Sequence, residues 1–254
     1  MRVASRLHYV HVASSEELTH YGCHTRRGTR AMDEIGILSG FGGTLLHDCW
    51  SAYWQYRGAR HAICHAHILR ELQFFIDEAA GQQGWAAQMK QLLLEIKEEV
   101  ERVRLRQGQR MDKQQCVVYK SRYDEIIKRG LEAHALAPEE REEPGRGEEH
   151  RPARSKRPPS LNLVLRLQHC KTEALRFMHD ARVPFTNNLA ERDLRMIRLQ
   201  QKISGCFRAP DGSRAFCRIR SFISTMKKQG REVVAELERV FRRPMSPALL
   251  GSSA

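Results

Sequence analysis

The chain has 254 residues, with 43 Lys and Arg against 30 Asp and Glu, and so a formal net charge of +13. Hydrophobic residues make up 41% of it, enough for a core, but no long uncharged apolar run is present to cross a membrane. The first residues lack an apolar stretch of signal-peptide length, so we expect a cytoplasmic, nucleoid-associated protein. The seven cysteines are odd in number and scattered, which favours reduced thiols over a disulfide framework.

The amino-terminal third of the chain alternates between strand-like and helix-like patterns. Alternation with a period of two is typical of strands, and apolar residues three and four apart are typical of helices. A glycine-rich turn before residue 44 leads into a short apolar run, so we expect a βαβ unit there. In chain order, the patterns predict strands over 6–12, 18–24, 44–46 and 59–64, and helices over 28–38 and 67–78.

The middle of the chain predicts helices and a linker. Apolar residues recur at helical spacing from Trp85 to Val103 and from Val117 to Leu131, which indicates two amphipathic helices that form an antiparallel pair. Residues 138–160 hold five of the nine prolines and almost nothing apolar, so we expect a disordered linker or long loop. Ser160 can cap a further helix, and residues 186–188 can cap the next one.

The carboxy-terminal part concentrates the positive charge. Residues 182–231 contain twelve basic residues against three acidic ones. A solvated surface usually mixes the two signs, so a nucleic-acid contact is the favoured reading of this segment.

Two carboxylates stand where metal-dependent chemistry could use them. Asp48 follows an apolar strand, at the kind of strand end where α/β proteins place active groups, although an Asp there is commonly a turn or cap residue. Glu191 stands in the first turn of a helix, where the dipole favours a carboxylate even without a function. If they meet at one edge of a sheet, they can share divalent metal ions, and Mg²⁺ suits such an all-oxygen site.

Four sequence blocks in one order resemble the bacterial insertion sequence 66 family of transposases. They are His47-Asp48-Cys49-Trp50 with Tyr53, residues 61–72 (HAICHAHILREL), residues 187–192 (NNLAER) and residues 202–208 (KISGCFR). The resemblance covers the chain from the first residue to about a helix over 233–240, and it weakens through the two middle helices and the linker.

The resemblance implies an α/β fold of the ribonuclease H-like kind, with a mixed sheet and helices, interrupted by an α-helical insertion. It also implies an Asp-Asp-Glu triad that binds two Mg²⁺ ions and carries out strand cleavage and strand transfer on double-stranded DNA, at transposon ends and target. Asp48 matches the second carboxylate and Glu191 the third. The first belongs to an Asp-Glu-Thr-Gly motif that would precede Met1, so we expect a shortened copy with little or no cleavage activity of its own.

The resemblance also divides the chain. It implies a first part of the core over 1–79 with its first strand mostly missing, a helical insertion over 80–181 that includes the linker, a closing helix with a DNA-binding segment over 182–243, and a disordered tail over 244–254. The residues expected to bind DNA are Arg192, Arg195, Lys202 and Arg208.

A cluster of histidines and a cysteine, His61, Cys64, His65 and His67, could be mistaken for a metal site. A structural zinc site usually takes four ligands as two separated pairs, and no second pair stands at a suitable distance. The Cys64-x-x-His67 pattern resembles a short motif of such transposases, so we expect Cys64 and His67, with Asn187 and Asn188, to support the site structurally.

Two other functions remain open. The chain could be a non-catalytic DNA-binding protein that associates with an intact transposase or with copies of itself, and both it and an enzyme would bind DNA in a salt-sensitive way. An RNA-processing nuclease on the same kind of sheet is the weaker alternative, because the blocks around Glu191 and Lys202 resemble transposases specifically.

Overall fold

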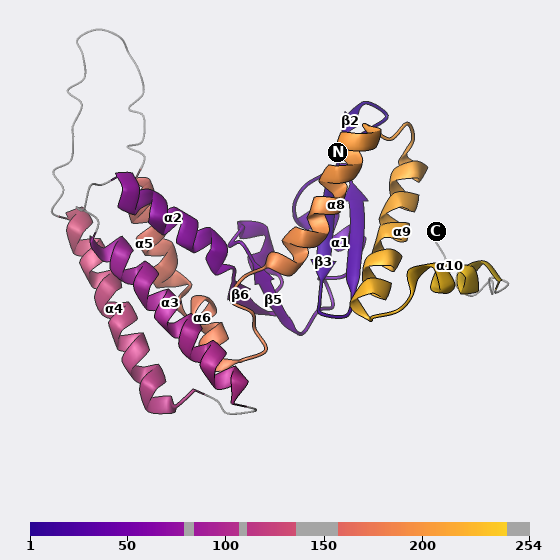
Figure 1. Ribbon diagram of the computed structural model, residues 1–254. Coiled ribbons are helices and arrows are strands. Elements are labelled where there is room, and N and C mark those ends of the chain that lie inside the picture. The colour runs from indigo at the N-terminus through magenta and orange to yellow at the C-terminus, as the bar shows by residue number, and fades with distance from the viewer. Residues whose placement is uncertain (79–83, 107–110, 136–156, 243–254) are drawn as a thin grey trace, which may run out of the picture. The chain divides into compact units, whose positions relative to one another are not determined.

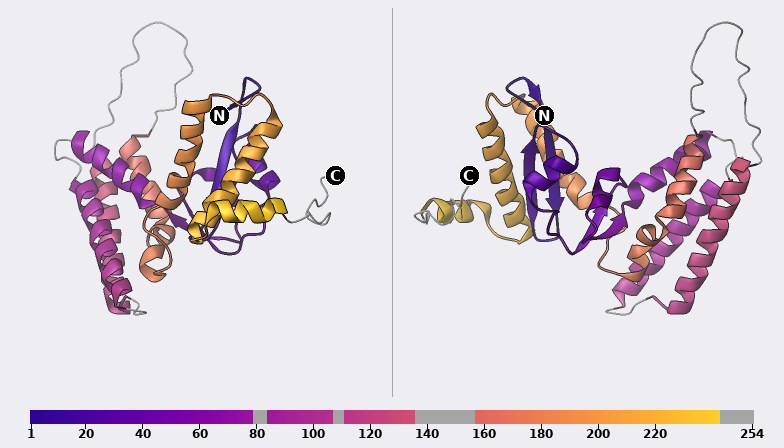
Figure 2. Two further views of the ribbon diagram at one scale, coloured as in Figure 1. Left: turned by 45° about the vertical axis from the view of Figure 1, so that its right-hand side comes forward. Right: turned by 180° about the vertical axis from the view of Figure 1, so that it is seen from behind.

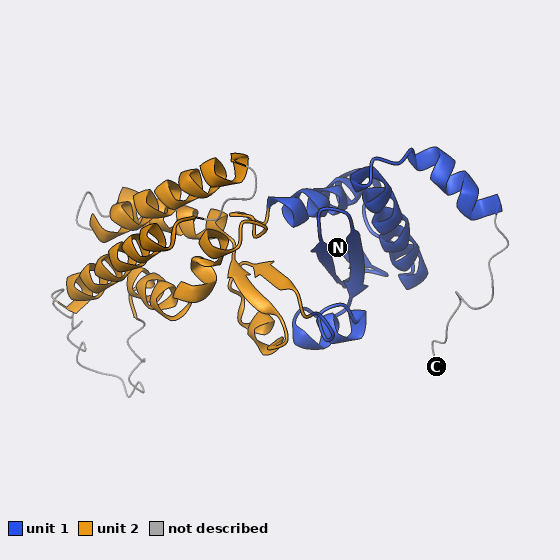
Figure 3. Ribbon diagram, turned by 90° about the horizontal axis from the view of Figure 1, so that it is seen from below, with its two compact units in different colours: residues 1–41, 188–254 blue, residues 42–187 orange. Residues whose placement is uncertain are grey.

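The computed structural model describes residues 1–78, 84–106, 111–135 and 157–242, and the chain falls into two compact units. Unit 1 consists of residues 1–41 and 188–254, and unit 2 of residues 42–187 (Figure 3). Unit 1 is therefore assembled from two segments that are far apart in the sequence, whereas unit 2 is continuous.

Unit 1 is built around an antiparallel hairpin of strands β3 (Tyr9–Ser14) and β4 (Thr19–His24). A shorter hairpin of β1 (Arg2–Val3) and β2 (Arg6–Leu7) precedes it. The helices of the unit are α1 (Thr29–Ile35), α8 (Asn188–Ser204), α9 (Pro210–Lys228) and α10 (Val233–Arg242) (Figure 1). Helix α8 packs on β3 and helix α9 on β4, as the view from behind in Figure 2 also shows.

Hydroxyl side chains join α9 to the open edge of β4. The backbone N–H of Tyr21 donates to Ser221 Oγ at 2.9 Å, and that of Thr19 donates to Thr225 Oγ1 at 3.1 Å. An edge strand otherwise leaves such N–H groups without a protein partner. Helix α9 therefore covers the edge and satisfies two of its donors.

Unit 2 combines a small parallel sheet with a helical bundle. Strands β5 (Thr44–His47) and β6 (Arg60–Ile63) pair from Thr44 opposite Arg60 to His47 opposite Ile63, and the short helix η1 (Ser51–Gln55) lies in the connection between them. The bundle contains α2 (His65–Glu78), α3 (Gly84–Leu105), α4 (Lys113–Ala135), α5 (Pro159–His169), α6 (Lys171–Ala174) and α7 (Arg176–His179).

The apolar periodicity of the bundle helices produces its core. Fully buried side chains of α2, α3, α4 and α5 meet there: Leu72, Met89, Leu92, Ile96, Tyr123, Leu163 and Leu167. The one polar group among these side chains is satisfied, because the Tyr123 hydroxyl donates to the carbonyl of Leu167 at 2.9 Å. Buried hydroxyls normally need such a partner.

The structure confirms a mixed α/β chain and corrects several details. The strand predicted over 6–12 is split at His8, because Arg6 and Leu7 pair with β1 while residues 9–14 pair with β4. The predicted βαβ unit is wrong, because β5 finds its parallel partner in β6 and β4 pairs with β3. The strands of the described residues form three two-stranded sheets.

The predicted helices are present with changed ends, with one exception. The helix expected after Ser160 is broken into α5, α6 and α7, which end at His169, Ala174 and His179. Most of the linker predicted over 138–160 and the tail over 244–254 lie outside the described residues, although Pro159 and Ser160 open α5. Among the described helices, none is long and apolar enough to cross a membrane.

Candidate functional site

Asp48 directly follows β5, where the parallel pair ends. Its side chain is exposed, and its Oδ1 accepts the backbone N–H of Trp50 at 3.2 Å. No ion pair between described residues involves it. A carboxylate that is exposed and has no cationic partner in the described part of the chain keeps oxygen lone pairs for a metal ion.

A chain of hydrogen bonds through two buried histidines holds the turn that carries Asp48. The N–H of Cys49, a residue in the left-handed region at φ 66°, lies 3.1 Å from His47 Nδ1. His47 Nε2 lies 3.0 Å from His61 Nδ1, and His61 Nε2 lies 3.1 Å from the carbonyl oxygen of Tyr56. One proton on Nε2 of each ring satisfies all three bonds.

The buried environment keeps His47 neutral. Burial and, to a smaller extent, the neighbouring His61 together lower its pKa to about 4, while Asp48 opposes the shift. The sequence drew attention to His61 as part of a possible metal cluster, but the role of His47 was missed. Its position directly before Asp48 was the available signal.

The remaining members of the histidine and cysteine cluster are Cys64, directly before α2, and His65 and His67 in its first turn. Cys64 is buried, and its Sγ accepts the backbone N–H of Asn187 at 3.2 Å. The His65 ring stacks on Phe185 with centroids 4.3 Å apart, and its Nδ1 lies 3.2 Å from the Phe185 carbonyl oxygen. The structure therefore brings Cys64 and Asn187 together, two of the four residues expected to support the site.

Glu191 lies in the first turn of α8, which begins at Asn188, and its side chain is half-buried. It belongs to unit 1, whereas Asp48 belongs to unit 2. Each carboxylate is therefore described within its own unit, and their meeting at one metal site stays a prediction.

A second acidic residue of α8, which sequence reasoning missed, is turned into unit 1. Asp193 Oδ2 accepts from Ser14 Oγ at 2.5 Å, from Thr19 Oγ1 at 2.9 Å and from Lys228 Nζ at 2.8 Å. Burial alone would raise the pKa of Asp193, but its bonds to Lys228 and the two hydroxyls more than offset this, and the pKa is lowered.

The cations of α8 differ from Asp193 in being exposed. Arg192, Arg195, Arg198 and Lys202 are exposed, and so is Arg208 in the segment after the helix. Within the described ranges, no ion pair involves any of these five residues. Four of them are the residues that the sequence predicted to bind DNA, and Arg198 is a further exposed cation on the same helix. We call the α8 members, Arg192, Arg195, Arg198 and Lys202, the cationic face of α8.

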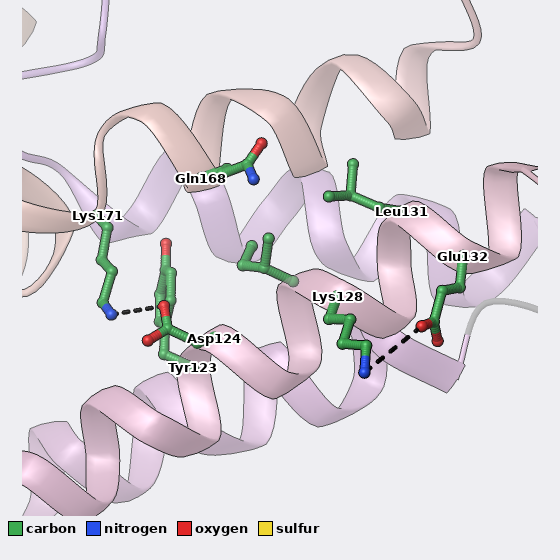
Figure 4. Close-up of a pocket in the computed structure, with 8 residues that line it drawn as sticks. Tyr123, Asp124, Lys128, Leu131, Glu132, Gln168 and Lys171 are labelled. Carbon is green, nitrogen blue, oxygen red and sulfur yellow. Dashed lines mark hydrogen bonds and ion pairs between the residues drawn. The ribbon is translucent and has the colours of Figure 1, made fainter.

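A groove of about 340 Å³ lies in the bundle of unit 2 (Figure 4). Its cations are already paired, because Lys171 reaches Asp124 at 2.5 Å and Lys128 reaches Glu132 at 3.9 Å. Nothing in this groove therefore calls for a charged ligand, unlike the cationic face of α8.

The comparisons with known proteins add one match. The model of a family described as "Transposase IS66 family" matches residues 1–215. No curated protein and no solved structure matches the chain. The matched range includes both carboxylates, the Cys64–His67 motif and the cationic face of α8.

Proposed function

The chain belongs to the IS66 family of transposases. We propose that it binds transposon DNA and takes part in metal-dependent strand cleavage and strand transfer. Transposases act on DNA, and a transposase of the Asp-Asp-Glu type depends on a divalent metal ion. The cationic face of α8 is the observation that carries the proposal. It places four exposed cations, none of them ion-paired to a described residue, on one helix directly after a candidate metal ligand.

Phosphate recognition explains the cationic face better than solvation does. The acidic residues of α8 are Glu191 and Asp193, and Asp193 is paired inward with Lys228. The outward surface of the helix is therefore left strongly positive. Arginine and lysine side chains position the DNA backbone by contacts to phosphate, without reading its sequence.

Asp48 and Glu191 would hold the metal, with Mg²⁺ as the proposed ion and two ions in a complete site. The exposed carboxylate of Asp48 fits this role because it has a free oxygen and no cationic partner among the described residues. Bound Mg²⁺ would polarise the phosphodiester and stabilise the leaving oxygen. In this proposal the His47–His61 pair fixes the turn of Asp48, and a ribonuclease H-like arrangement of the core brings Glu191 to it.

DNA binding is tested by removing charge from α8. In a variant with Arg192, Arg195, Arg198 and Lys202 all changed to Gln, we expect the plot of log affinity against log salt to become shallower by about 3 to 4 units, because each phosphate contact contributes about 0.9. The matched control changes four cations that already have carboxylate partners: Lys97, Arg122, Lys128 and Arg129. Equal salt slopes for the two variants would contradict the proposed interface.

Metal binding is tested with Mn²⁺ as a spectroscopic substitute for Mg²⁺. We expect Asp48→Asn and Glu191→Gln each to weaken Mn²⁺ binding by about tenfold or more, because each removes a charged oxygen ligand. Glu16→Gln, at an exposed residue that the site does not use, is the control. Unchanged Mn²⁺ affinity in both site variants would remove them from the proposed site.

A non-catalytic DNA-binding role is the second candidate. The observation that favours it is the cationic face of α8, because contacts to DNA phosphates need no metal ion. Nicking of supercoiled DNA that carries transposon ends, in Mg²⁺, separates the two. Nicking that Asp48→Asn abolishes supports the enzyme, whereas salt-sensitive binding without nicking supports a DNA-binding protein that works with an intact transposase.

A further inference from the structure

The most densely bonded carboxylate of unit 1 is Asp193, and its partners come from three other elements or their borders. Ser14 ends β3, Thr19 begins β4 and Lys228 ends α9. The side chains of the ion pair are largely buried, with 13% of Asp193 and 12% of Lys228 exposed. Lys228 Nζ also donates to the carbonyls of Ser15 and Leu18, at 3.0 and 3.3 Å.

The backbone of Asp193 is also hydrogen-bonded to the β3–β4 hairpin. The Tyr21 hydroxyl donates to the carbonyl of Asp193 at 2.9 Å, and the side chain of Tyr21 is 2% exposed. Both the side chain and the backbone of Asp193 are therefore fixed against the β3–β4 hairpin. We call this set, Ser14, Thr19, Tyr21, Asp193 and Lys228, the Asp193 hub.

Helix geometry links the hub to the candidate site. With 3.6 residues per turn, successive side chains are about 100° apart around the axis, so a residue two positions away lies about 200° around the helix. Glu191 and Arg195 are both two positions from Asp193. When Asp193 faces the hairpin, Glu191 and Arg195 lie together on the opposite side of α8, and Lys202, nine positions on, lies there as well.

The apolar core of unit 1 is small compared with that of unit 2. Its buried cluster consists of Tyr21, Ile197 and Cys217, whereas the cluster of unit 2 extends over all the bundle helices. Apolar contacts are non-directional and tolerate small rotations, but several hydrogen bonds to one oxygen do not. In unit 1 the directional contacts come from the Asp193 hub.

We propose that Asp193 is a positioning residue that sets the rotation of α8 and thereby the direction of Glu191 and of the cationic face. Asp193 touches neither metal nor DNA in this proposal, which rests on the proposed function because it assigns Glu191 to the metal. A purely structural carboxylate would affect the stability of unit 1 but not the affinities of the folded protein. This difference makes the two roles separable.

The experiment measures Mn²⁺ affinity and DNA affinity of the full chain well below its unfolding temperature. Asp193→Ala is expected to weaken both by fivefold or more, although it removes no metal ligand and no cation. Asp193→Asn is expected to restore both to within about twofold, because its amide oxygen can still accept two of the three bonds that now end on Oδ2. Glu34→Ala, which removes an exposed carboxylate of α1 paired with His24 and Arg30, is the matched control and is expected to change neither.

A double variant shows whether the effect runs through Glu191. Once Glu191→Gln has removed the proposed ligand, adding Asp193→Ala should weaken Mn²⁺ binding no further, because residues that act as a unit are not additive. If Asp193→Ala does not fold, Ser14→Ala and Thr19→Val each remove one hydroxyl and are expected to give smaller losses of the same two affinities.

The outcomes distinguish the inference from the proposed function. If Glu191→Gln weakens Mn²⁺ binding and folded Asp193 or hydroxyl variants change neither affinity, the positioning role is overturned. If Glu191→Gln leaves Mn²⁺ binding unchanged, the metal role of Glu191 fails, and DNA affinity decides. Loss of DNA affinity in Asp193→Ala then supports the positioning of the cationic face by Asp193. Unchanged DNA affinity in this variant overturns the positioning role.

Discussion

His65 is a buried histidine whose apolar surroundings disfavour its protonated form. It is 1% exposed, stacked on Phe185 and edge-on to Phe177. Burial lowers its pKa to about 4, while its bond to the Phe185 carbonyl works in the opposite direction. Since an unfolded histidine has a pKa near 6.5, the unfolded chain takes up a proton at a pH where the folded chain does not.

Stability of unit 2 is therefore expected to fall as the pH drops from about 6.5 to about 4. The unfolded state binds more protons in this window, and His65 alone accounts for a loss of about 3 kcal/mol at most, of which about 2 kcal/mol is reached at pH 5. Below about pH 4 both states are protonated and its contribution stops changing. Urea denaturation followed by tryptophan fluorescence, at about pH 7.5 and pH 5, measures the loss, because Trp50, Trp54 and Trp85 all lie in unit 2.

The His65 contribution is isolated with His65→Phe, which keeps a ring in the slot but cannot titrate. The substitution should lower the free energy of unfolding by about 1 kcal/mol near pH 7.5, because a hydrogen bond is lost. At pH 5 the variant should be more stable than the wild type. His169→Phe, at an exposed position of α5, should keep the wild-type dependence on pH. A parallel response of wild type and His65→Phe would show that His65 is not the titrating group.

At the scale of elements, Gly130 sets how closely the bundle helices approach. A Cβ at this position of α4 would lie 3.0 Å from Val164 Cγ2 on α5 and 3.3 Å from Trp85 Cδ2 on α3. Neither neighbour can move easily, because Val164 is fully buried and stiff at its branched Cβ and Trp85 is 3% exposed. The glycine therefore serves close packing between three helices.

Gly130→Ala is expected to lower the free energy of unfolding of unit 2 by about 1 kcal/mol. Alanine gains about 1 kcal/mol in helix propensity, but overpacking a core costs about 1 to 3 kcal/mol, and the second effect should win. Gly84→Ala, in the first turn of α3 with open space around the added methyl group, should be neutral or stabilising. The same denaturation assay compares the two variants. If Gly130→Ala were as stable as Gly84→Ala, the helices around Gly130 would be shown to accommodate the added methyl group.

The helices of unit 2 were predictable because their evidence is local. Apolar residues from Trp85 to Val103 mark one face of α3 in the sequence itself, and the same is true of α4. The partner of β5 was not predictable in this way, because strand pairing depends on contacts between segments. The helix after Ser160 was expected as one piece, since its breaks at Cys170 and Leu175 carry neither Gly nor Pro.

The candidate site also has a part that was predictable from local sequence and a part that was not. Asp48, Glu191 and the cations of α8 were predicted as site residues from motifs and charge, which are visible along the chain. The Asp193 hub was missed because Asp193 lies 179 residues from Ser14 and 174 from Thr19. No pattern in one sequence ties an acid to hydroxyls at such separations, and only folding brings them together.

At the scale of the whole molecule, the two units differ in how the chain builds them. The main apolar cluster runs from Ala62 to Phe185 and lies wholly within unit 2, which is one continuous segment. Unit 1 needs both of its segments, because the Asp193 hub and the edge of β4 are completed by residues from each. Continuity along the chain is what allows a compact unit to be separated from the rest.

We therefore expect a fragment of residues 42–187 to fold by itself and to unfold cooperatively. It carries every residue of its own apolar cluster, and its size falls in the usual range for a domain. A fragment of residues 188–242 should not unfold cooperatively, because α8 and α9 lose the hairpin that Ser221, Thr225 and Asp193 bind. Denaturation followed by circular dichroism tests both. Adding a peptide of residues 1–41 should restore cooperativity to the second fragment, and a first fragment that melts without a transition would show that unit 2 depends on unit 1.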